Sequence, residues 1–593
     1  MELKSRAEMD PKYMWDLTPI FPNEQAWEDA LKQATEAVKT LSAIPGTLGN
    51  SLESFKDGLD KIYAVTEQIE RVANYAFLKK AGDNGDTKNQ EMEARCISLL
   101  TAFQSAVAFL NPEILDMDSE KLDSFMKDDS VKTYRHMIED VCRMRAHMLD
   151  KEGEKMLAML SDAAGTPRNV FDMFESVDMT FPNVIDENGN EVPLSHGTFG
   201  VYRESKSAAV RKDAFEKYFG EFKKYINTLT ATYAGSVKFD CYDSDVRGYK
   251  SACEAALDGN NVPVSLYDNL VSSLESGLGT MKRYLEMRRK ALGQDELHLY
   301  DLYVPMIDEV DFDMPYEKAQ QLVLEATKPM GEEYGKTLRR AFDERWIDVY
   351  ENKGKTTGAF SSGVFGVHPY VLLNYTNTLD DAFTLAHELG HAMHSYRSDT
   401  TQDGVNHDYR IFVAEVASTV NEVLLTKYLL KVETDPKRRA YILNHFLEGF
   451  RTTVFRQTLF AEFERKAHDM YQAGQPLTAD ALNKVYHDLN AKYYQGAVID
   501  PITDIEWARI PHFYRAFYVY QYSTGFCSAV TIADKLFRGE GVEDYLKFLS
   551  LGGSDYPLNE LKVAGVDLLK PDAIENAMRV FAETVDELEK LIG

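Results

Sequence analysis

Residues 54–80 read SFKDGLDKIYAVTEQIERVANYAFLKK, and apolar side chains recur in this stretch every three or four positions. That interval matches the 3.6-residue turn of an α-helix that packs one face inward. The same interval returns far along the chain, in ADALNKVYHDLNAKYYQGAV at 479–498. Most of the remaining sequence follows this pattern, so we predict a mainly α protein.

Two stretches interrupt the helical pattern. The first, TFPNVIDENGNEVPLSHGTFGV at 180–201, combines proline and Asn-Gly with short apolar pieces, which is typical of a small hairpin or loop. A chain of 593 residues exceeds the size at which a single core stops growing, so two or more domains, or one large elongated body, are expected. We therefore predict an N-terminal helical region at 1–200 and a second domain at 201–593.

The second interruption is GAFSSGVFGVHPYVLLNY at 358–375. Its first half is rich in glycine and serine, which favours a flexible loop. Its apolar end, residues 370–375, predicts a strand. We expect a small β element at this point of an otherwise helical fold.

The amino-acid composition indicates which classes of binding partner and which cellular compartment to expect. The chain carries 66 basic and 95 acidic residues, a net charge of −29, so its field repels nucleic acids and anionic lipids. No stretch approaches the roughly 20 apolar residues of a membrane span, and the first residues lack the apolar segment of a secretory signal. Five cysteines without a CxxC pair argue against a disulfide framework and a thiolate zinc site. We expect a soluble, cytoplasmic protein that binds neither nucleic acid nor membrane.

A metal-binding pattern follows the predicted strand directly. The run His387-Glu388-Leu389-Gly390-His391 comes shortly after Thr378 and Asp381, whose spacing is typical of the first turn of a helix. Two histidines four positions apart on a helix have Cβ atoms about 6 Å apart, so both imidazoles can bind one Zn²⁺. Glu388 is rotated by about 100° from His387, which lets it hold a water as a general base without binding the metal. A chance match on an amphipathic helix is the alternative, and the preceding strand and helix start favour the metal site.

A catalytic zinc site needs a third protein ligand and an open position for water. His394 lies on the same helix face, but it is about 4.5 Å further along the axis than His391, a poor position for completing the tetrahedron. Glu415, in the helical stretch AEVASTVNE at 414–422, is the better candidate, with an ordinary exposed glutamate as the alternative. Glu422 lies on the same face and would accept the free N–H of a ligand histidine.

An aromatic segment, PHFYRAFYVYQYSTG at 511–525, holds His512 and four tyrosines within 11 residues. Amide hydrolysis passes through a tetrahedral intermediate, and tyrosine hydroxyls beside a metal can donate hydrogen bonds to its oxyanion. The alternative is an amphipathic aromatic segment that packs in the core.

Together these motifs resemble the oligoendopeptidase F group of the thimet-oligopeptidase-like zinc metallopeptidases. The resemblance spans most of the chain, because several further motifs keep the order and spacing of that family. They are GAFSSGVFGVHPYVLLNY, HELGHAMHS, AEVASTVNE, HFYRAFYVYQYSTG and LGGSDYPLNELKVAGVD at 551–567.

The resemblance implies a large helical clamshell of two lobes, with a deep channel and the zinc at its floor. It also implies one zinc ion per chain, held by His387, His391 and Glu415, with Glu388 as the catalytic base. His512 and Tyr522 match a segment that contacts substrate and the oxyanion in relatives. The lobe at 1–200 would then cover a catalytic domain at 201–593.

The activity that these residues predict is endopeptidase cleavage of short, unstructured oligopeptides. The strand at 370–375 would pair with the substrate backbone, which gives broad specificity. A zinc carboxypeptidase of similar helical, clefted fold is the alternative enzyme. A catalytically silent peptide-binding scaffold is disfavoured, because Glu388 and the three predicted ligands are all present. The sequence gives no indication of the oligomeric state.

Overall fold

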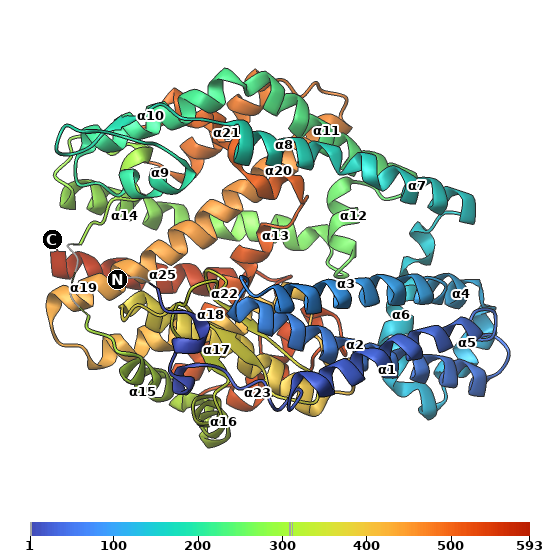
Figure 1. Ribbon diagram of the computed structural model, residues 1–593. Coiled ribbons are helices and arrows are strands. Elements are labelled where there is room, and N and C mark those ends of the chain that lie inside the picture. The colour runs from blue at the N-terminus through green and yellow to red at the C-terminus, as the bar shows by residue number, and fades with distance from the viewer. Residues whose placement is uncertain (1–2, 308–309, 311, 593) are drawn as a thin grey trace. The chain divides into compact units, whose positions relative to one another are not determined.

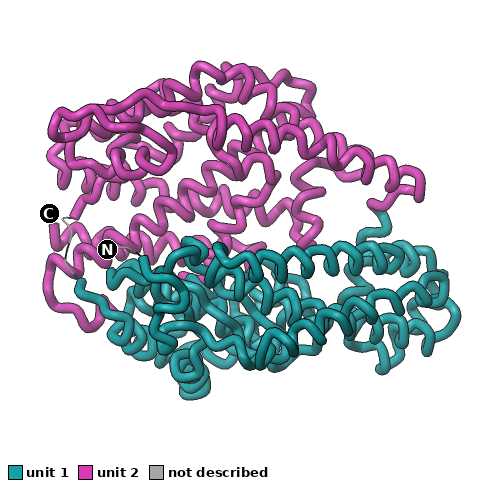
Figure 2. Tube along the Cα trace, in the orientation of Figure 1, with its two compact units in different colours: residues 1–146, 312–428, 532–566 teal, residues 147–311, 429–531, 567–593 magenta. Residues whose placement is uncertain are grey.

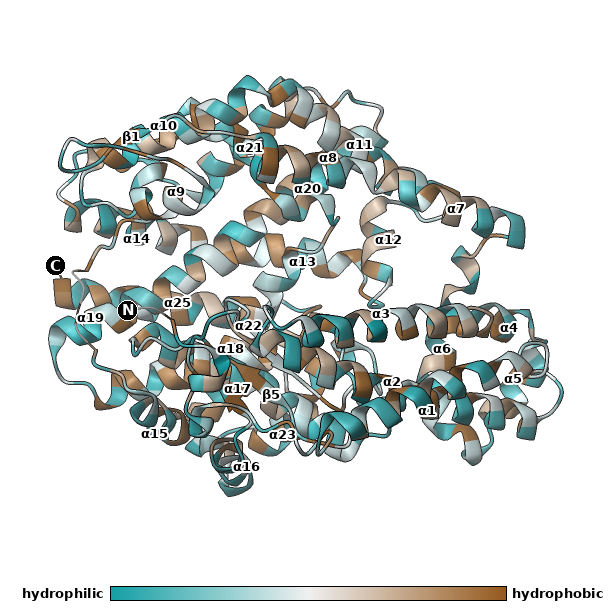
Figure 3. Cartoon of the chain, in the orientation of Figure 1, coloured by the Kyte–Doolittle hydropathy of each residue, from teal (hydrophilic) through white to brown (hydrophobic). Residues whose placement is uncertain are grey.

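The computed structural model describes residues 3–307, 310 and 312–592. Helices make up most of the chain, and the strands are few and short (Figure 1). Figure 3 shows hydrophilic and hydrophobic residues interspersed along these helices, as amphipathic helices require. The mainly α fold predicted from the periodicity is therefore confirmed.

The chain forms two compact units, and each is assembled from three separate segments (Figure 2). Unit 1 comprises residues 1–146, 312–428 and 532–566, and unit 2 comprises residues 147–311, 429–531 and 567–593. The predicted domain boundary at residue 200 and the predicted deep channel are not tested by this division and stay predictions.

Unit 1 consists of helices from all three of its segments and one small sheet. Its elements are α1 (Glu24–Thr40), α2 (Leu52–Gly82), α3 (Thr87–Val107), α4 (Leu110–Asp116), α5 (Ser119–Met126), α6 (Arg135–Arg143), α15 (Tyr316–Ala326), α16 (Glu332–Asp343), β3 (Ile347–Asp348), β4 (Phe360–Ser362), β5 (Tyr370–Leu372), α17 (Leu379–Thr401), most of α18 (Ile411–Val432), α23 (Val542–Phe548) and α24 (Pro557–Val563).

Unit 2 is helical apart from one hairpin. Its elements are α7 (Lys151–Ala164), α8 (Thr166–Met173), β1 (Val184–Ile185), β2 (Glu191–Val192), α9 (His196–Arg203), α10 (Ala208–Lys224), α11 (Ile226–Val246), α12 (Ala252–Asp258), α13 (Val264–Leu274), α14 (Leu278–Ala291), α19 (Pro436–Gly449), α20 (Arg456–Gln472), α21 (Ala479–Tyr493), most of α22 (Tyr520–Phe537) and α25 (Asp572–Ile592).

The core of unit 1 explains the helix that opened the sequence. Residues 54–80 lie within α2, whose inward positions are buried along its whole length. Trp27 of α1 is completely buried, and its Nε1 donates to the carbonyl of Val72 on α2 at 2.9 Å. The same core reaches Tyr370 and Leu372 of β5, so the long helices and the sheet share one packed interior.

The hairpin expected at 180–201 is present in unit 2. β1 and β2 pair antiparallel, with Val184 opposite Val192. The interruption ends earlier than predicted, because α9 already begins at His196. Ser195 caps that helix: its Oγ accepts from the backbone N–H of Thr198 at 3.1 Å.

The second interruption contains two strands rather than a loop and one strand. β4 forms at 360–362, inside the stretch that we expected to be a loop, and pairs antiparallel with β5. β5 also pairs in parallel with β3, so the order in the sheet is β3-β5-β4. The predicted strand at 370–375 is present as β5 but is shorter, ending at Leu372, while single backbone bonds from Leu373 and Tyr375 continue to Asp348 and Val349.

The position of β5 corrects one prediction. The strand at 370–375 was expected to pair with the substrate backbone. β5 is the central strand, fully buried and bonded on both edges, so it has no free edge for a peptide. Among the described residues β4 pairs only with β5, which leaves its other edge without a partner strand.

One helical segment comes nearer to the composition of a membrane span than we expected. By length and composition alone, Thr87–Asp116 could cross a bilayer, with a mean hydropathy of 1.2 in its most apolar window. A single segment of this kind is weak evidence, since helices of soluble proteins also meet these criteria. Here α3 packs through Met92, Cys96 and Leu99 into the core of unit 1.

Candidate active site

Helix α17 carries the His-Glu-x-x-His run and begins where the sequence predicted. The Oγ1 of Thr378 accepts from the backbone N–H of Asp381 at 3.2 Å. The Asp381 carboxylate accepts in return from the backbone N–H of Thr378 at 2.9 Å and from its hydroxyl at 2.7 Å. This reciprocal cap fixes the first turn of the helix directly after the sheet.

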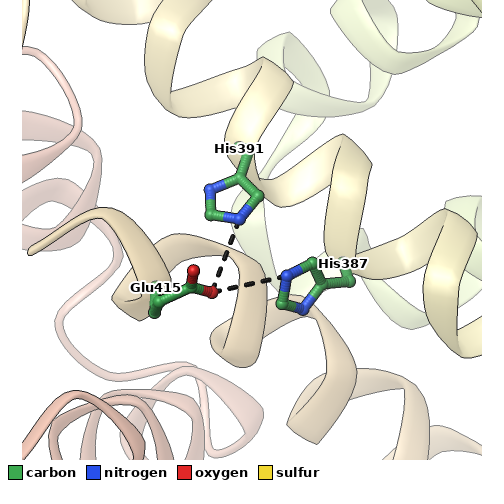
Figure 4. A group of neighbouring side chains, drawn as sticks. All are labelled: His387, His391 and Glu415. Atoms are coloured by element: carbon green, nitrogen blue, oxygen red, sulfur yellow. Dashed lines mark ion pairs between the residues drawn. The ribbon is translucent and has the colours of Figure 1, made fainter. Parts of the chain in front are cut away.

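The three predicted metal ligands converge in the structure. His387 and His391 project from α17, and Glu415 projects from α18 toward both rings (Figure 4). The Oε2 atom of Glu415 lies 3.4 Å from Nε2 of His387 and 3.5 Å from Nε2 of His391. Ligands around a tetrahedral zinc with bonds of about 2.0–2.1 Å are roughly 3.3 Å apart, so the donor set and its spacing fit this ion.

Glu422 occupies the position expected of a group that orients a ligand. Its carboxylate forms a close hydrogen bond with Nδ1 of His387, which directs Nε2 of the same ring toward Glu415. Burial alone would lower the pKa of His387, but the bonds to Glu415 and Glu422 raise it to about 10. Without a metal, the His387 side chain is therefore the positively charged imidazolium at neutral pH, with both ring nitrogens protonated.

Glu388 follows His387 on α17 and is buried, with 6% of its surface exposed. Burial raises the pKa of its carboxyl group, while the neighbouring imidazoles of His387 and His391 lower it less strongly. A carboxylate with a raised pKa accepts a proton more readily than an exposed glutamate does. The chemistry of this position suits a general base.

Gly390 has a structural role that the sequence analysis did not identify. A Cβ atom at this position would lie 2.5 Å from both the carbonyl oxygen of Ala417 and the Cα of Ser418. Helices α17 and α18 therefore cross with backbones in contact at Gly390. A glycine inside a helix lowers the stability of the helix by about 1 kcal/mol relative to alanine. Its presence at position 390 despite this loss was the sequence signal that another backbone approaches the helix closely there.

Two polar residues of α18 complete this crossing. Asn421 is fully buried, and its Nδ2 donates to the carbonyl of Ala386 on α17 at 3.0 Å. The hydroxyl of Tyr334 on α16 donates to Asn421 Oδ1 at 3.0 Å. Ser418 donates to the Oε2 atom of Glu415 at 3.1 Å. A buried asparagine within an apolar helix was the available sequence signal for this contact.

His394 lies outside the group that converges on Glu415. Its ring is buried and stacks on Tyr409, with centroids 3.6 Å apart. Burial, together with the charge of His391, lowers its pKa to about 3. His394 is thus a neutral core residue, which agrees with the geometric argument that placed it apart from the ligands.

The aromatic segment belongs to unit 2 and divides into two sets. Tyr520 is buried in the core, and Tyr514 stacks on Phe171 with ring centroids 4.6 Å apart. His512 and Tyr522 lie together, with ring centroids 6.1 Å apart, and both are partly accessible to solvent. The catalytic roles of His512 and Tyr522 stay predictions.

Tyr518 joins that accessible pair. Its ring lies 5.4 Å from that of Tyr522 and 6.4 Å from that of His512. Sequence reasoning did not single out Tyr518 from its neighbours. Buried and accessible positions follow no regular period along the segment, so no sequence pattern indicated Tyr518.

Sequence comparisons agree with the family resemblance that the motifs indicated. Peptidase family M3 matches residues 201–580, and Oligopeptidase F matches residues 113–181. The chain is 42% identical to Oligopeptidase PepF of Bacillus subtilis (strain 168), an alignment that covers 100% of this chain and 89% of the relative. It is 38% identical to Group B oligopeptidase PepB of Streptococcus agalactiae, covering 99% of this chain and 98% of the relative.

Solved structures share the fold. A crystal structure from Chlamydophila abortus matches with a TM-score of 0.95 and 31% identity, and the match covers 100% of both chains. The crystal structure of oligoendopeptidase-F from Enterococcus faecium matches with a TM-score of 0.74 and 37% identity, covering 96% of this chain and 99% of that one.

Proposed function

Because the chain belongs to peptidase family M3, it is a metallopeptidase that cuts oligopeptides at internal bonds, and we propose that it works with one zinc ion and Glu388. The ion would be held by His387, His391 and Glu415. The observation that carries this proposal is the position of Glu415 Oε2, 3.4 and 3.5 Å from the two imidazole Nε2 atoms. The Glu415 side chain is 47% exposed, so the site is open to a substrate on one side.

Each residue has a defined task in the hydrolysis. A zinc ion bound at this site supplies a Lewis acid that polarises a carbonyl and brings the pKa of water near 7. Glu388 takes a proton from the attacking water on its carboxylate and then gives it to the leaving amine. Glu422 holds His387 in one tautomer and one orientation throughout.

We assign substrate alignment to β4 in place of β5. An extended peptide can add a strand to the unpaired edge of β4, with main-chain hydrogen bonds that are largely independent of side chains. A cavity of about 350 Å³ lies against β4 and α17, lined by Ser362, Ser395 and Glu70 among others. A cavity lined in part by residues of β4 supports this assignment.

His512 and Tyr522 are our candidates for hydrogen-bond donors to the oxyanion, and Tyr518 joins them on the basis of its contacts with both rings. Removing one such donor costs about 10²–10³ in kcat. Tyr522→Phe and Tyr518→Phe should lower kcat by this factor and leave KM nearly unchanged. Tyr520→Phe, a change at a buried position of the same segment, is the matched control. Full activity in both of the first two variants would remove the tyrosines from the mechanism.

Variants of the site residues distinguish the proposed zinc ligands from the proposed general base. Glu388→Gln should retain one zinc per chain and lose nearly all turnover. Glu415→Ala should lose zinc, and His394→Ala should retain it. Metal analysis of the purified variants gives the answer, and substantial activity in Glu388→Gln would refute the role of Glu388. Loss of zinc in His394→Ala but not in Glu415→Ala would transfer the third ligand to His394.

The mode of cleavage has a separate test. An internal cut of a peptide blocked at both ends, read by mass spectrometry, distinguishes an endopeptidase from the carboxypeptidase alternative. The relatives' names, oligopeptidase and oligoendopeptidase, do not favour that alternative. Trimming by one residue at a time would restore it.

We also propose a cytoplasmic location. The five cysteines are free in the part of the chain that the structure describes, as expected for a reducing compartment. Burial raises the pKa of Cys96, Cys241, Cys253 and Cys527 to about 12, which keeps these thiols unreactive. Recovery of the protein in a membrane or extracellular fraction would contradict this proposal.

A further inference from the structure

Unit 2 contains a group of arginines around Tyr303, which we call the arginine cluster. Its members come from five elements that are distant in sequence. They are Arg203 at the end of α9, Arg288 on α14, Arg451 in the π-helical turn η10 (Phe450–Phe455), Arg456 at the start of α20 and Arg509 at the end of the 3₁₀ segment η11 (Pro501–Arg509). A π-helical turn inside a longer helix often marks a functional position.

The cluster has more positive than negative charge. Glu448 pairs with Arg288 at 2.8 Å and also with Arg451. Glu506 pairs with Arg456 at 2.6 Å and with Arg509 at 3.4 Å. Counted over the residues that the structure describes, these two carboxylates face five guanidinium groups, an excess of three positive charges in a chain of net charge −29.

Arg203 has no carboxylate partner within ion-pair distance among the residues that the structure describes. Its guanidinium instead lies over the ring of Tyr303, with Cζ 3.7 Å from the centroid. Arg451 lies over the same ring at 4.6 Å. Two cations therefore contact one phenol ring, and both retain donors that this contact does not use.

Several N–H groups of the cluster are buried and have no acceptor within the described part of the chain. They are Nε of Arg203, Nε of Arg288, Nη1 of Arg451 and Nε of Arg509. Arg451 is only 1% exposed, so its free donor does not lie at the protein surface. Buried charged donors without acceptors are rare, and a bound anion is one way to satisfy them.

The pKa of Tyr303 depends on the electrostatic potential of the arginine cluster. Burial would raise the pKa of Tyr303, yet the positive charges of Arg456, Arg451 and Arg203 lower it to about 8. A bound anion would cancel part of that potential. The phenol of Tyr303 is thus a built-in indicator of occupancy.

We propose that Arg203, Arg451 and Tyr303 line a binding site for a carboxylate group. The guanidinium fork matches the two oxygens of a carboxylate, and the unpaired donors on two arginines supply the contacts. Arg203 and Tyr303 are only partly buried, which leaves a path for entry. The carboxylate can come from a free acid or from the C-terminus of a peptide; the second source rests on the proposed peptidase function.

Binding is tested first without any reliance on activity. Tyrosinate absorbance near 295 nm of the zinc-loaded enzyme should show one group titrating near pH 8, absent in Tyr303→Phe. Acetate should shift this titration upward by about one pH unit, and acetamide should not. Arg203→Gln should weaken acetate binding by about tenfold or more, and Arg283→Gln, an exposed arginine of unit 2 outside the cluster, should leave it unchanged.

Two results would overturn the site: no effect of acetate on the wild-type titration, or equal acetate affinity in wild type and Arg203→Gln. If Arg203→Gln shows a lowered Tm or zinc content, the conservative Arg203→Lys replaces it with the same expectation, because lysine keeps the charge and lacks the planar fork. An absence of peptidase activity would refute the proposed function and leave this binding result unaffected.

The source of the carboxylate is tested with paired peptides. One peptide of each pair ends in a free carboxylate and the other in an amide. If the peptide C-terminus occupies the site, kcat/KM should favour the free acid by about tenfold in the wild type, and Arg203→Gln should abolish that preference. An equal rate for both peptides, together with acetate binding, assigns the site to free carboxylates.

Discussion

Alanine at position 390 would place a methyl group where α17 and α18 cross. Its Cβ would lie 2.5 Å from Ala417 O and Ser418 Cα, and ordinary van der Waals contact begins near 3.4 Å. The backbone of α18 must therefore retreat by about 0.9 Å, the difference between these two distances. The three nearest atoms all belong to the backbone of α18, so no side-chain rotation can relieve the contact.

The consequence for metal binding follows from the geometry. Glu415 lies on the same turn of α18 as the displaced atoms, whereas zinc sites tolerate deviations of about 0.2 Å in ligand distance. We expect Gly390→Ala to weaken zinc binding by about 10–100-fold and to lower the free energy of unfolding by about 1–3 kcal/mol. Zinc affinity is measured by competition with a chromophoric chelator, and stability by denaturant unfolding.

Gly220→Ala is the matched control. Gly220 lies inside helix α10, and a Cβ there would have no neighbour within 4 Å. This change should raise stability by about 0.5–1 kcal/mol and leave zinc affinity unchanged. If Gly390→Ala binds zinc as tightly as the wild type, the crossing does not set the position of Glu415 and the reasoning is wrong.

Three further outcomes are expected. Glu422→Gln should weaken zinc binding by about 10–100-fold, because a neutral amide no longer holds His387 as firmly; a chelator competition assay shows this, and an unchanged affinity would contradict it. Asn421→Ala should destabilise the protein by about 1–3 kcal/mol in denaturant unfolding, since Tyr334 and the carbonyl of Ala386 lose their partner; a change below 0.5 kcal/mol, roughly the scatter of surface substitutions, would show that the contact contributes little. The metal-free protein holds a proton on His387 with a pKa of about 10, so apparent zinc affinity should rise with pH below that value, by about tenfold per unit. Calorimetry in buffers of different ionisation enthalpy should detect the released proton, and zinc binding that is independent of pH would refute this account.

The mainly α fold and the donor set could be predicted because both depend on local spacing. Histidines four residues apart share a helix face in any helix, and the cap at Thr378 announced where that helix begins. The placement of Glu415 needed the family resemblance as well, because spacing along the chain does not define how two helices cross. Gly390 lies where the two helices cross, but only the position of the α18 backbone in the structure explains why this residue must be glycine.

Features that depend on contacts between residues distant in sequence could not be predicted from local sequence patterns. A two- or three-residue strand carries too little periodicity to show whether it is central or at an edge, so β5 was assigned the role that suits β4. The arginine cluster brings together positions between 203 and 509, and no local pattern links them. The division of the chain into two units follows contacts between distant segments, which no local sequence pattern shows.

The three-segment construction of unit 1 has a consequence during protein synthesis. The ring of Phe548, in the last segment of this unit, packs 5.3 Å from that of His394 on α17, which carries two of the proposed zinc ligands. At about 5–20 residues per second, the ribosome adds Phe548 several seconds or more after it has added Glu415. The proposed zinc ligands must therefore remain in an incomplete unit while the nascent chain grows. Early metal capture or chaperone protection in that interval would bear on the yield of active enzyme.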